Sequence, residues 1–174
     1  YRIVAAWHPG RVRALFGRLQ IFSAAFMAFG HGSNDGQKFI GVFAMALVLG
    51  GVFDTFNIPY WVILVCATVM GLGTSFGGWR IIKTLGMKMV KLEPYQGFSA
   101  ETAAASTITL ASHFGIPLST THTIGTSIMG SGIAHRRSTL NTLVVKNIVL
   151  AWILTFPICG GIAFLITHLL RLIF

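Results

Sequence analysis

Charge is scarce in this chain, and its scarcity argues against a soluble fold. Only 10% of the 174 residues are charged, whereas 54% are hydrophobic. Soluble domains carry about 25% charged residues, so a water-soluble protein of this composition would need an unusually large core. The composition therefore predicts an integral membrane protein.

Acidic residues are the rarest of the charged ones. The chain has 4 Asp and Glu residues against 13 Lys and Arg residues, which gives a net charge of +9. The basic residues fall into clusters at 2–18, 80–91 and 136–146, each beside an apolar block. Such flanking clusters set the orientation of membrane spans and argue against nucleic-acid binding. We expect a protein of the cell (plasma or inner) membrane with these basic loops in the cytoplasm.

Catalytic and metal-binding spacings are missing as well. The two cysteines, Cys66 and Cys159, lie inside apolar blocks, where cysteine usually packs as a small apolar residue. The sequence has no HExxH spacing and no nucleophile–base spacing. We therefore predict that the chain is not an enzyme, has no cofactor, and binds no metal beyond Na⁺ at Asn34 and Asp35.

The apolar blocks have lengths suited to a bilayer, because a helix needs about 20 apolar residues to cross roughly 30 Å of hydrocarbon. The pattern predicts an all-α integral membrane fold, and we expect a kink near Pro157 in its last helix. The expected segments are a basic cytoplasmic lead-in at 1–19, a broken transmembrane helix at 20–53, a transmembrane helix at 60–77, an amphipathic interfacial helix at 78–93, a re-entrant helical hairpin at 97–134 and a kinked transmembrane helix at 141–174.

The break in the first block is predicted from a glycine-rich motif. Residues 30–36 read Gly-His-Gly-Ser-Asn-Asp-Gly, a composition that disfavours continuous helix. We expect half-helices at about 20–31 and 37–53, joined by unwound backbone. Such backbone is tolerated at membrane depth only inside protein or beside a water-filled cavity.

Asp35 is the strongest single indication of function. An ionisable residue inside a span costs at least ~2.5 kcal/mol at the helix centre and is usually functional. With Asn34 and Ser33 beside it, the carboxylate is suited to bind a small cation. The alternative is an ion pair with Lys38, one helical turn further on, and both arrangements can hold together.

The stretch at 97–134 is rich in hydroxyl groups, with 13 Ser and Thr residues between Ser99 and Ser131. Helices are expected at about 98–113 and 119–134, on either side of Gly115-Ile116-Pro117. Each would be roughly 24 Å long, short of the hydrocarbon thickness, which favours a re-entrant hairpin. Two full spans would give the same orientation and remain an alternative.

The second of these helices opens with Ser119-Thr120-Thr121-His122-Thr123. A buried helix N-terminus with hydroxyl side chains suits an anion, although Ser and Thr can also merely cap and join helices. Glu101 is expected either to share a proton or cation site or to neutralise the N-terminus of its own helix. His31 and His122 are expected to donate hydrogen bonds rather than to bind metal.

Three motifs in this order resemble the PiT family of inorganic-phosphate transporters. Residues 30–38 are similar to the Gly-x-Asn-Asp signature in the second half of that family, and residues 96–101 and 117–123 resemble two further elements. The resemblance implies one repeat of an inverted-repeat transporter, whose two repeats hold phosphate between them and are driven by Na⁺ or H⁺. It also implies that Asn34 and Asp35 are cation ligands.

The site residues expected from the motifs form two sets. The phosphate-binding set is Ser33, Ser119, Thr120 and Thr121, and the cation-binding or coupling set is Asn34, Asp35, Glu101 and Thr123. A cation at Asp35 would remove its repulsion of an anion, so the two ligands should bind cooperatively.

Cation-coupled transport of inorganic phosphate across a membrane is the predicted function. A sulfate or other oxyanion transporter of the same fold and a passive anion channel module are the alternatives. The expected partners are phosphate, Na⁺ or H⁺, the lipid bilayer, the missing other half-repeat and further copies of the chain in a homo-oligomer.

Overall fold

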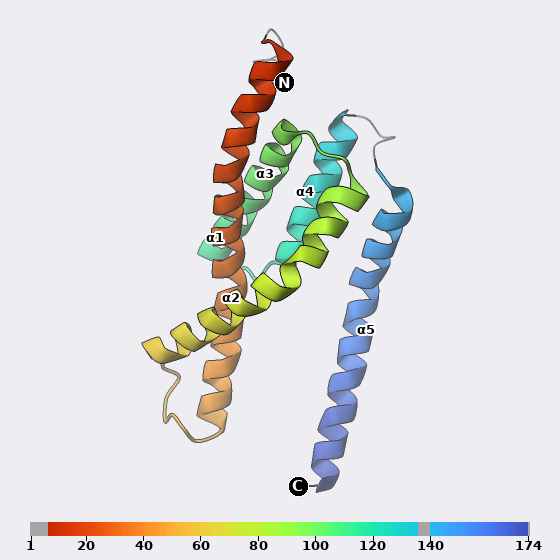
Figure 1. Ribbon diagram of the computed structural model, residues 1–174. Coiled ribbons are helices and arrows are strands. Elements are labelled where there is room, and N and C mark those ends of the chain that lie inside the picture. The colour runs from red at the N-terminus through yellow and green to blue at the C-terminus, as the bar shows by residue number, and fades with distance from the viewer. Residues whose placement is uncertain (1–6, 136–139, 174) are drawn as a thin grey trace.

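The computed structural model describes residues 7–135 and 140–173, and the chain is almost entirely helical in these ranges (Figure 1). Arg2, Arg136 and Arg137, on which the predicted orientation partly rests, lie outside the described residues. The helices are α1 Pro9–Leu49, α2 Tyr60–Ile82, the π-helix η1 Lys83–Met89, α3 Pro94–His113, α4 Thr120–His135 and α5 Thr142–Ile173.

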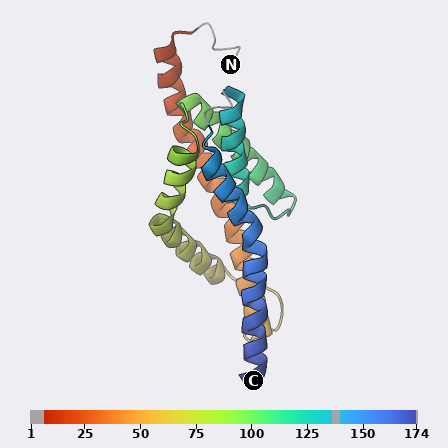
Figure 2. The ribbon, with the colours of Figure 1, turned by 90° about the vertical axis from the view of Figure 1, so that its right-hand side faces the viewer.

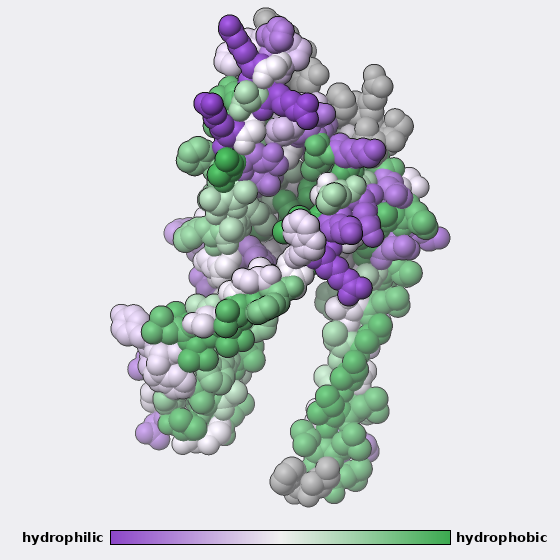
Figure 3. All heavy atoms as spheres, viewed as in Figure 1, coloured by the Kyte–Doolittle hydropathy of each residue, from purple (hydrophilic) through white to green (hydrophobic). Residues whose placement is uncertain are grey.

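Among the described residues, three helical stretches are long and apolar enough to cross a membrane, namely Pro9–Leu49, Tyr60–Met89 and Thr142–Leu172. Many of their large apolar side chains are exposed. Figure 3 shows this apolar surface over the ends of α1 and α5 that lie far from the N-terminus, with hydrophilic side chains gathered nearer to it. Apolar surface of this extent requires a cover of lipid or of further protein.

The helix α1 begins at Pro9, ahead of its apolar part. Pro9 stands in its first turn, where proline is favoured, and His8 Nδ1 accepts a hydrogen bond from the Gly10 amide at 3.2 Å. A helix of 41 residues is about 62 Å long, twice the hydrocarbon thickness. The basic lead-in from residue 9 onward therefore continues as the same helix as the apolar part.

The predicted break at 30–36 is wrong, because α1 runs through the glycine-rich motif without interruption. The motif side chains His31, Asn34 and Asp35 have partners on the neighbouring hairpin, and the backbone stays helical. The glycines cost roughly 1 kcal/mol each relative to alanine. At Gly30 the two helices lie in contact, since a Cβ there would lie 3.4 Å from Thr109 Oγ1 and 3.7 Å from the Ala105 carbonyl oxygen of α3, which is ordinary van der Waals distance.

The helices α3 and α4 form a hairpin whose tip lies part-way along α1 (Figures 1 and 2). A capping box between Glu93 and Gln96 begins α3. Gly115, at φ +69°, follows its end and turns the chain toward α4. The buried small residues Ala104 and Ala105 allow α3 to lie close to α1.

The stretch at 78–93 differs from the separate interfacial helix that its pattern predicts. The helix α2 extends to Ile82 and passes directly into η1. The apolar side chains Leu85 and Met89 are buried in a core cluster with Ala100 of α3 and Ile128 of α4. Leu85 and Met89 of the apolar face therefore pack on the hairpin, whereas Ile81 and Ile82 are exposed.

The helix α5 is attached near its start, and Figure 1 shows the rest of it apart from the other helices. Val90 and Leu140 form an antiparallel bridge, and the Asn141 amide donates to the Met89 carbonyl oxygen at 3.0 Å. Further along, the Trp152 ring lies 4.2 Å from the His122 ring of α4. The helix continues through Pro157 as one element, and the predicted kink there stays a prediction.

Candidate functional site

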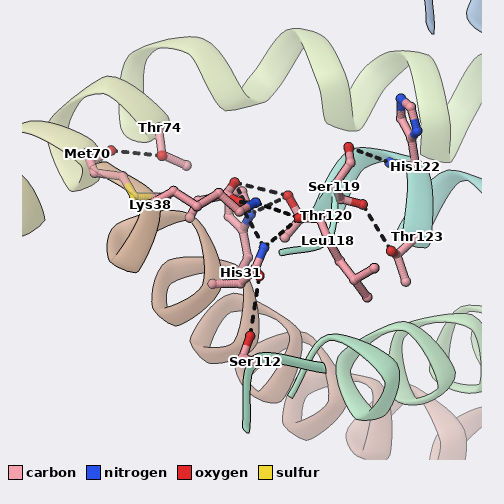
Figure 4. A network of polar contacts seen from close by, with 12 residues as sticks. His31, Lys38, Met70, Thr74, Ser112, Leu118, Ser119, Thr120, His122 and Thr123 are labelled. Carbon is pink, nitrogen blue, oxygen red and sulfur yellow. Dashed lines mark hydrogen bonds and ion pairs between the residues drawn. The ribbon is translucent and has the colours of Figure 1, made fainter. Parts of the chain in front are cut away.

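A polar stripe on α1 faces the tip of the hairpin (Figure 4). Its members are spaced i, i+3, i+4 and i+7, which places them on one side of a helix with 3.6 residues per turn. They are His31, Asn34, Asp35 and Lys38. Because α1 is continuous, these four side chains lie on one face of the helix. An unwound motif would not hold them in this arrangement.

The Asp35 carboxylate is the centre of the stripe, and each of its oxygens has two neighbours. The oxygen Oδ1 accepts from Lys38 Nζ at 2.9 Å and from Asn34 Nδ2 at 3.0 Å. The oxygen Oδ2 accepts from the Thr120 hydroxyl at 3.1 Å, and His31 Nδ1 lies 3.2 Å away. The carboxylate is thus fully hydrogen-bonded, with 21% of its side chain exposed.

Thr120 determines which nitrogen of His31 carries a proton. The Thr120 hydroxyl has one hydrogen, which it donates to Asp35. His31 Nδ1 lies 2.9 Å from the same hydroxyl oxygen, so the imidazole is the donor in that contact. Thr120 is only 4% exposed, and its hydroxyl joins α4 directly to α1.

The hairpin tip contributes a backbone carbonyl as well. The Leu118 carbonyl oxygen accepts from Asn34 Nδ2 at 2.8 Å and also from Lys38 Nζ. On the other side of Asn34, the Ser112 hydroxyl donates to its Oδ1 at 3.3 Å. Asn34 is 3% exposed, and its two contacts join α3 and the turn before α4 to α1.

The start of α4 lies beside this cluster. The Ser119 hydroxyl accepts from the His122 amide at 3.4 Å, an N-terminal capping contact. The Thr123 hydroxyl donates to the Ser119 carbonyl oxygen at 3.0 Å. The first turn of α4 thus presents amide groups and an exposed serine at the protein's most polar internal contact, an arrangement suited to an anion.

The structure brings only some of the predicted site residues together. Asn34, Asp35 and Thr120 meet in the cluster; Ser119 directly precedes Thr120, and Thr123 lies about one turn further along α4. Thr120 was expected to bind phosphate, but its hydroxyl hydrogen is donated to Asp35.

Ser33 and Thr121 point elsewhere. Ser33 lies about 160–200° around α1 from the stripe residues His31 and Asp35, because each helical residue turns about 100°. Thr121 is exposed and lines a pocket of about 350 Å³ between α2 and α5, with Arg80 and Trp152. Neither side chain contacts the Asp35 cluster in the structure.

Glu101 lies in a separate contact near the other end of the hairpin. Its carboxylate accepts a hydrogen bond from the buried Ser23 hydroxyl of α1. Ser23 precedes Asp35 by 12 residues, about 18 Å along the helix. Glu101 is also not the cap of α3, since Glu93 holds that position. The two carboxylates therefore do not share one site.

Three groups that contact the Asp35 cluster were not predicted from the sequence or were left as one of two alternatives. The ion pair of Lys38 with Asp35, one of two alternatives, is present. The Leu118 carbonyl gave no sequence signal, because any residue has one. Ser112 was one of many hydroxyls, and only the turn of α3 decides that it faces Asn34. Within the described residues, no group of three or more His, Cys, Asp or Glu side chains could hold a metal ion.

Comparison with known proteins gives one consistent family. A family model described as the phosphate transporter family matches residues 3–163. The probable low-affinity inorganic phosphate transporters of Rhizobium meliloti and Bacillus subtilis are 46% and 42% identical over 150 and 160 residues. These alignments cover 86% and 91% of this chain and 45% and 48% of the relatives, so the chain spans about half their length.

A solved structure described as the sodium-dependent phosphate transporter has the same fold. It aligns with a TM-score of 0.74 and 32% identity, over 90% of this chain and 40% of that one. The relatives are transporters rather than enzymes, in agreement with the prediction. The family match covers more than nine-tenths of the sequence, and three apolar helices accompany it. The chain is an integral membrane protein and belongs to the phosphate transporter family.

Proposed function

We propose that this chain forms one half of a cation-coupled carrier for inorganic phosphate. The observation that carries the proposal is the Asp35 cluster, which joins the middle of a long membrane helix to the first turn of α4. Hydrogen-bonded carboxylate, carbonyl and hydroxyl groups within a membrane helix mark ion pathways in carriers. The named relatives of the same family carry inorganic phosphate.

The anion is assigned to the start of α4. Amide groups at a helix N-terminus point outward and carry the positive end of the helix dipole, which favours phosphate without a fixed charge. The exposed Ser119 hydroxyl adds a further donor at this place. A neutral donor set of this kind permits release as well as binding.

The cation is assigned to Asp35, which stands beside that anion position. The Lys38 ammonium, 2.9 Å from Asp35 Oδ1, already offsets the repulsion between this carboxylate and an anion. A bound cation or proton adds positive charge beside the anion position, so binding of the cation and of phosphate should favour each other. The proposed coupling cation is Na⁺ or H⁺.

The hairpin is assigned a re-entrant path. The helix α4 has 16 residues and is about 24 Å long, short of roughly 30 Å of hydrocarbon. Its first turn contacts Asp35, 26 residues after the start of α1, so the tip would lie at depth within the bilayer. A second, inverted repeat would face it and cover part of the exposed α2 and α5.

Uptake of radiolabelled phosphate into proteoliposomes with the full-length protein tests the proposal, under imposed Na⁺ and H⁺ gradients. We expect gradient-driven accumulation that a hundredfold excess of sulfate does not block. Block by sulfate would assign the carrier to oxyanions in general. Equilibration without any gradient dependence would indicate a passive anion channel and would contradict the coupled mechanism.

A further inference from the structure

The ammonium group of Lys38 lies where a bound metal cation would be expected. Its Nζ donates to Asp35 Oδ1 at 2.9 Å and to the Leu118 carbonyl oxygen. One of these oxygens belongs to α1 and the other to the hairpin tip. Lys38 therefore bridges the two elements as a bound cation would.

The same oxygens are the ligands that a small hard cation prefers. Carboxylate and backbone carbonyl oxygens bind such ions, and broken or terminal helix segments in carriers supply them. Asn34 Nδ2 donates to both oxygens as well, at 3.0 and 2.8 Å. With two nitrogen donors on the same pair of oxygens, Na⁺ cannot bind to both without displacing the Lys38 ammonium.

The charges in the cluster also balance without a free ion. Asp35 contributes one negative charge and Lys38 one positive charge, and His31 is the remaining titratable group. From the hairpin, the contacting groups are the hydroxyls of Ser112 and Thr120 and the Leu118 carbonyl, all uncharged. The repulsion between Asp35 and an anion at α4 is therefore already neutralised by a side chain.

We propose that Lys38 is a tethered cation that occupies the metal-ion position of Asp35 and closes this half of the carrier to Na⁺. The inference rests on the proposed function only for the place of the cluster in the transport pathway. A proton needs no such space, since it can pass onto the carboxylate or the imidazole while Lys38 stays nearby. Lys38 thus decides which cation this half can bind.

The test is the thermal stability of the purified full-length protein in NaCl against choline chloride at equal ionic strength. The variant Lys38→Met removes the charge and keeps the length of the side chain. We expect its Tm to fall in choline chloride and to recover in NaCl, beyond any response of the wild type. Lys38→Arg, which keeps the positive charge, should respond to Na⁺ as the wild type does.

Two further variants make the result specific. The double variant Asp35→Asn with Lys38→Met should lose the added Na⁺ response, because the carboxylate that binds the ion is gone. Lys88→Met, at an exposed lysine of η1, should respond as the wild type. Lys38→Gln is the second neutral variant if Lys38→Met does not fold.

An equal Na⁺ response in the wild type and in both neutral variants would overturn the inference. So would an added response that persists without the Asp35 carboxylate. This readout is independent of transport, so a failure of the inference and a failure of the proposed function can be told apart. Absence of phosphate uptake by the wild type would refute the function, whereas the Na⁺ shift alone decides the role of Lys38.

Discussion

Replacing Thr120 with valine removes the one hydroxyl that joins α4 to the Asp35 carboxylate. Valine keeps the branched shape, so the buried position stays filled while two contacts are lost, 3.1 Å to Asp35 and 2.9 Å to His31. A hydrogen bond to a charged group contributes about 1.5–3 kcal/mol. Because 21% of the Asp35 side chain is exposed, water replaces part of this, and we use the lower limit.

The Thr120 hydroxyl stabilises the free Asp35 carboxylate and competes with a cation for its oxygen, so losing about 1.5 kcal/mol corresponds to roughly tenfold tighter cation binding. The concentration of the coupling cation at half-maximal phosphate uptake should therefore fall about tenfold in Thr120→Val. The assay is initial-rate uptake into proteoliposomes over a range of Na⁺ concentration or external pH.

The matched control is Thr126→Val on the same helix. The Thr126 hydroxyl is exposed and donates to the backbone carbonyl oxygens of its own helix. We expect this variant to show the wild-type dependence on the cation. If Thr120→Val also stayed within twofold of the wild type, the hydroxyl would not position Asp35 and the described coupling geometry would be refuted.

Further substitutions test other parts of the structure. Asp35→Asn should abolish cation-driven phosphate accumulation while membrane insertion is retained, and unchanged accumulation would contradict the assigned coupling role. Gly30→Val should lower the Tm of the purified protein, because its methyl groups would meet the α3 backbone, and an unchanged Tm would contradict the close α1–α3 packing. Trp152→Ala should remove the contact with His122, worth about 1 kcal/mol, and increase proteolysis of α5 in detergent, whereas wild-type protection would show that this contact does not hold the helix.

The sequence predicts the hairpin better than it predicts α1. Around Gly115 the glycine and the following proline both disfavour helix, and the Gly115 and Ile116 amides donate to the Ser112 and Ala111 carbonyl oxygens, so the chain turns. Around Gly30–Gly36 the local preference against helix is overridden by contacts with the hairpin. The hairpin supplies close packing for Gly30 and partners for Asn34 and Asp35, information that is absent from the local sequence.

In the candidate site, too, the local sequence does not predict which single residue makes a given contact. Hydroxyl groups at Ser119, Thr120 and Thr121 are chemically similar, but each step along a helix turns about 100°. Only Thr120 therefore contacts Asp35, while Thr121 faces α2 and α5. The sequence predicts the motif that lies against Asp35, and packing selects which of its residues contacts the carboxylate.

The most direct test of the account is phosphate accumulation driven by a cation gradient, measured in proteoliposomes with the wild-type full-length protein and Asp35→Asn in parallel. The account predicts accumulation above the external concentration in the wild type, collapse of that accumulation when an ionophore dissipates the gradient, and no accumulation in Asp35→Asn. Equal uptake with and without the gradient, or a gradient response that survives in Asp35→Asn, would contradict it.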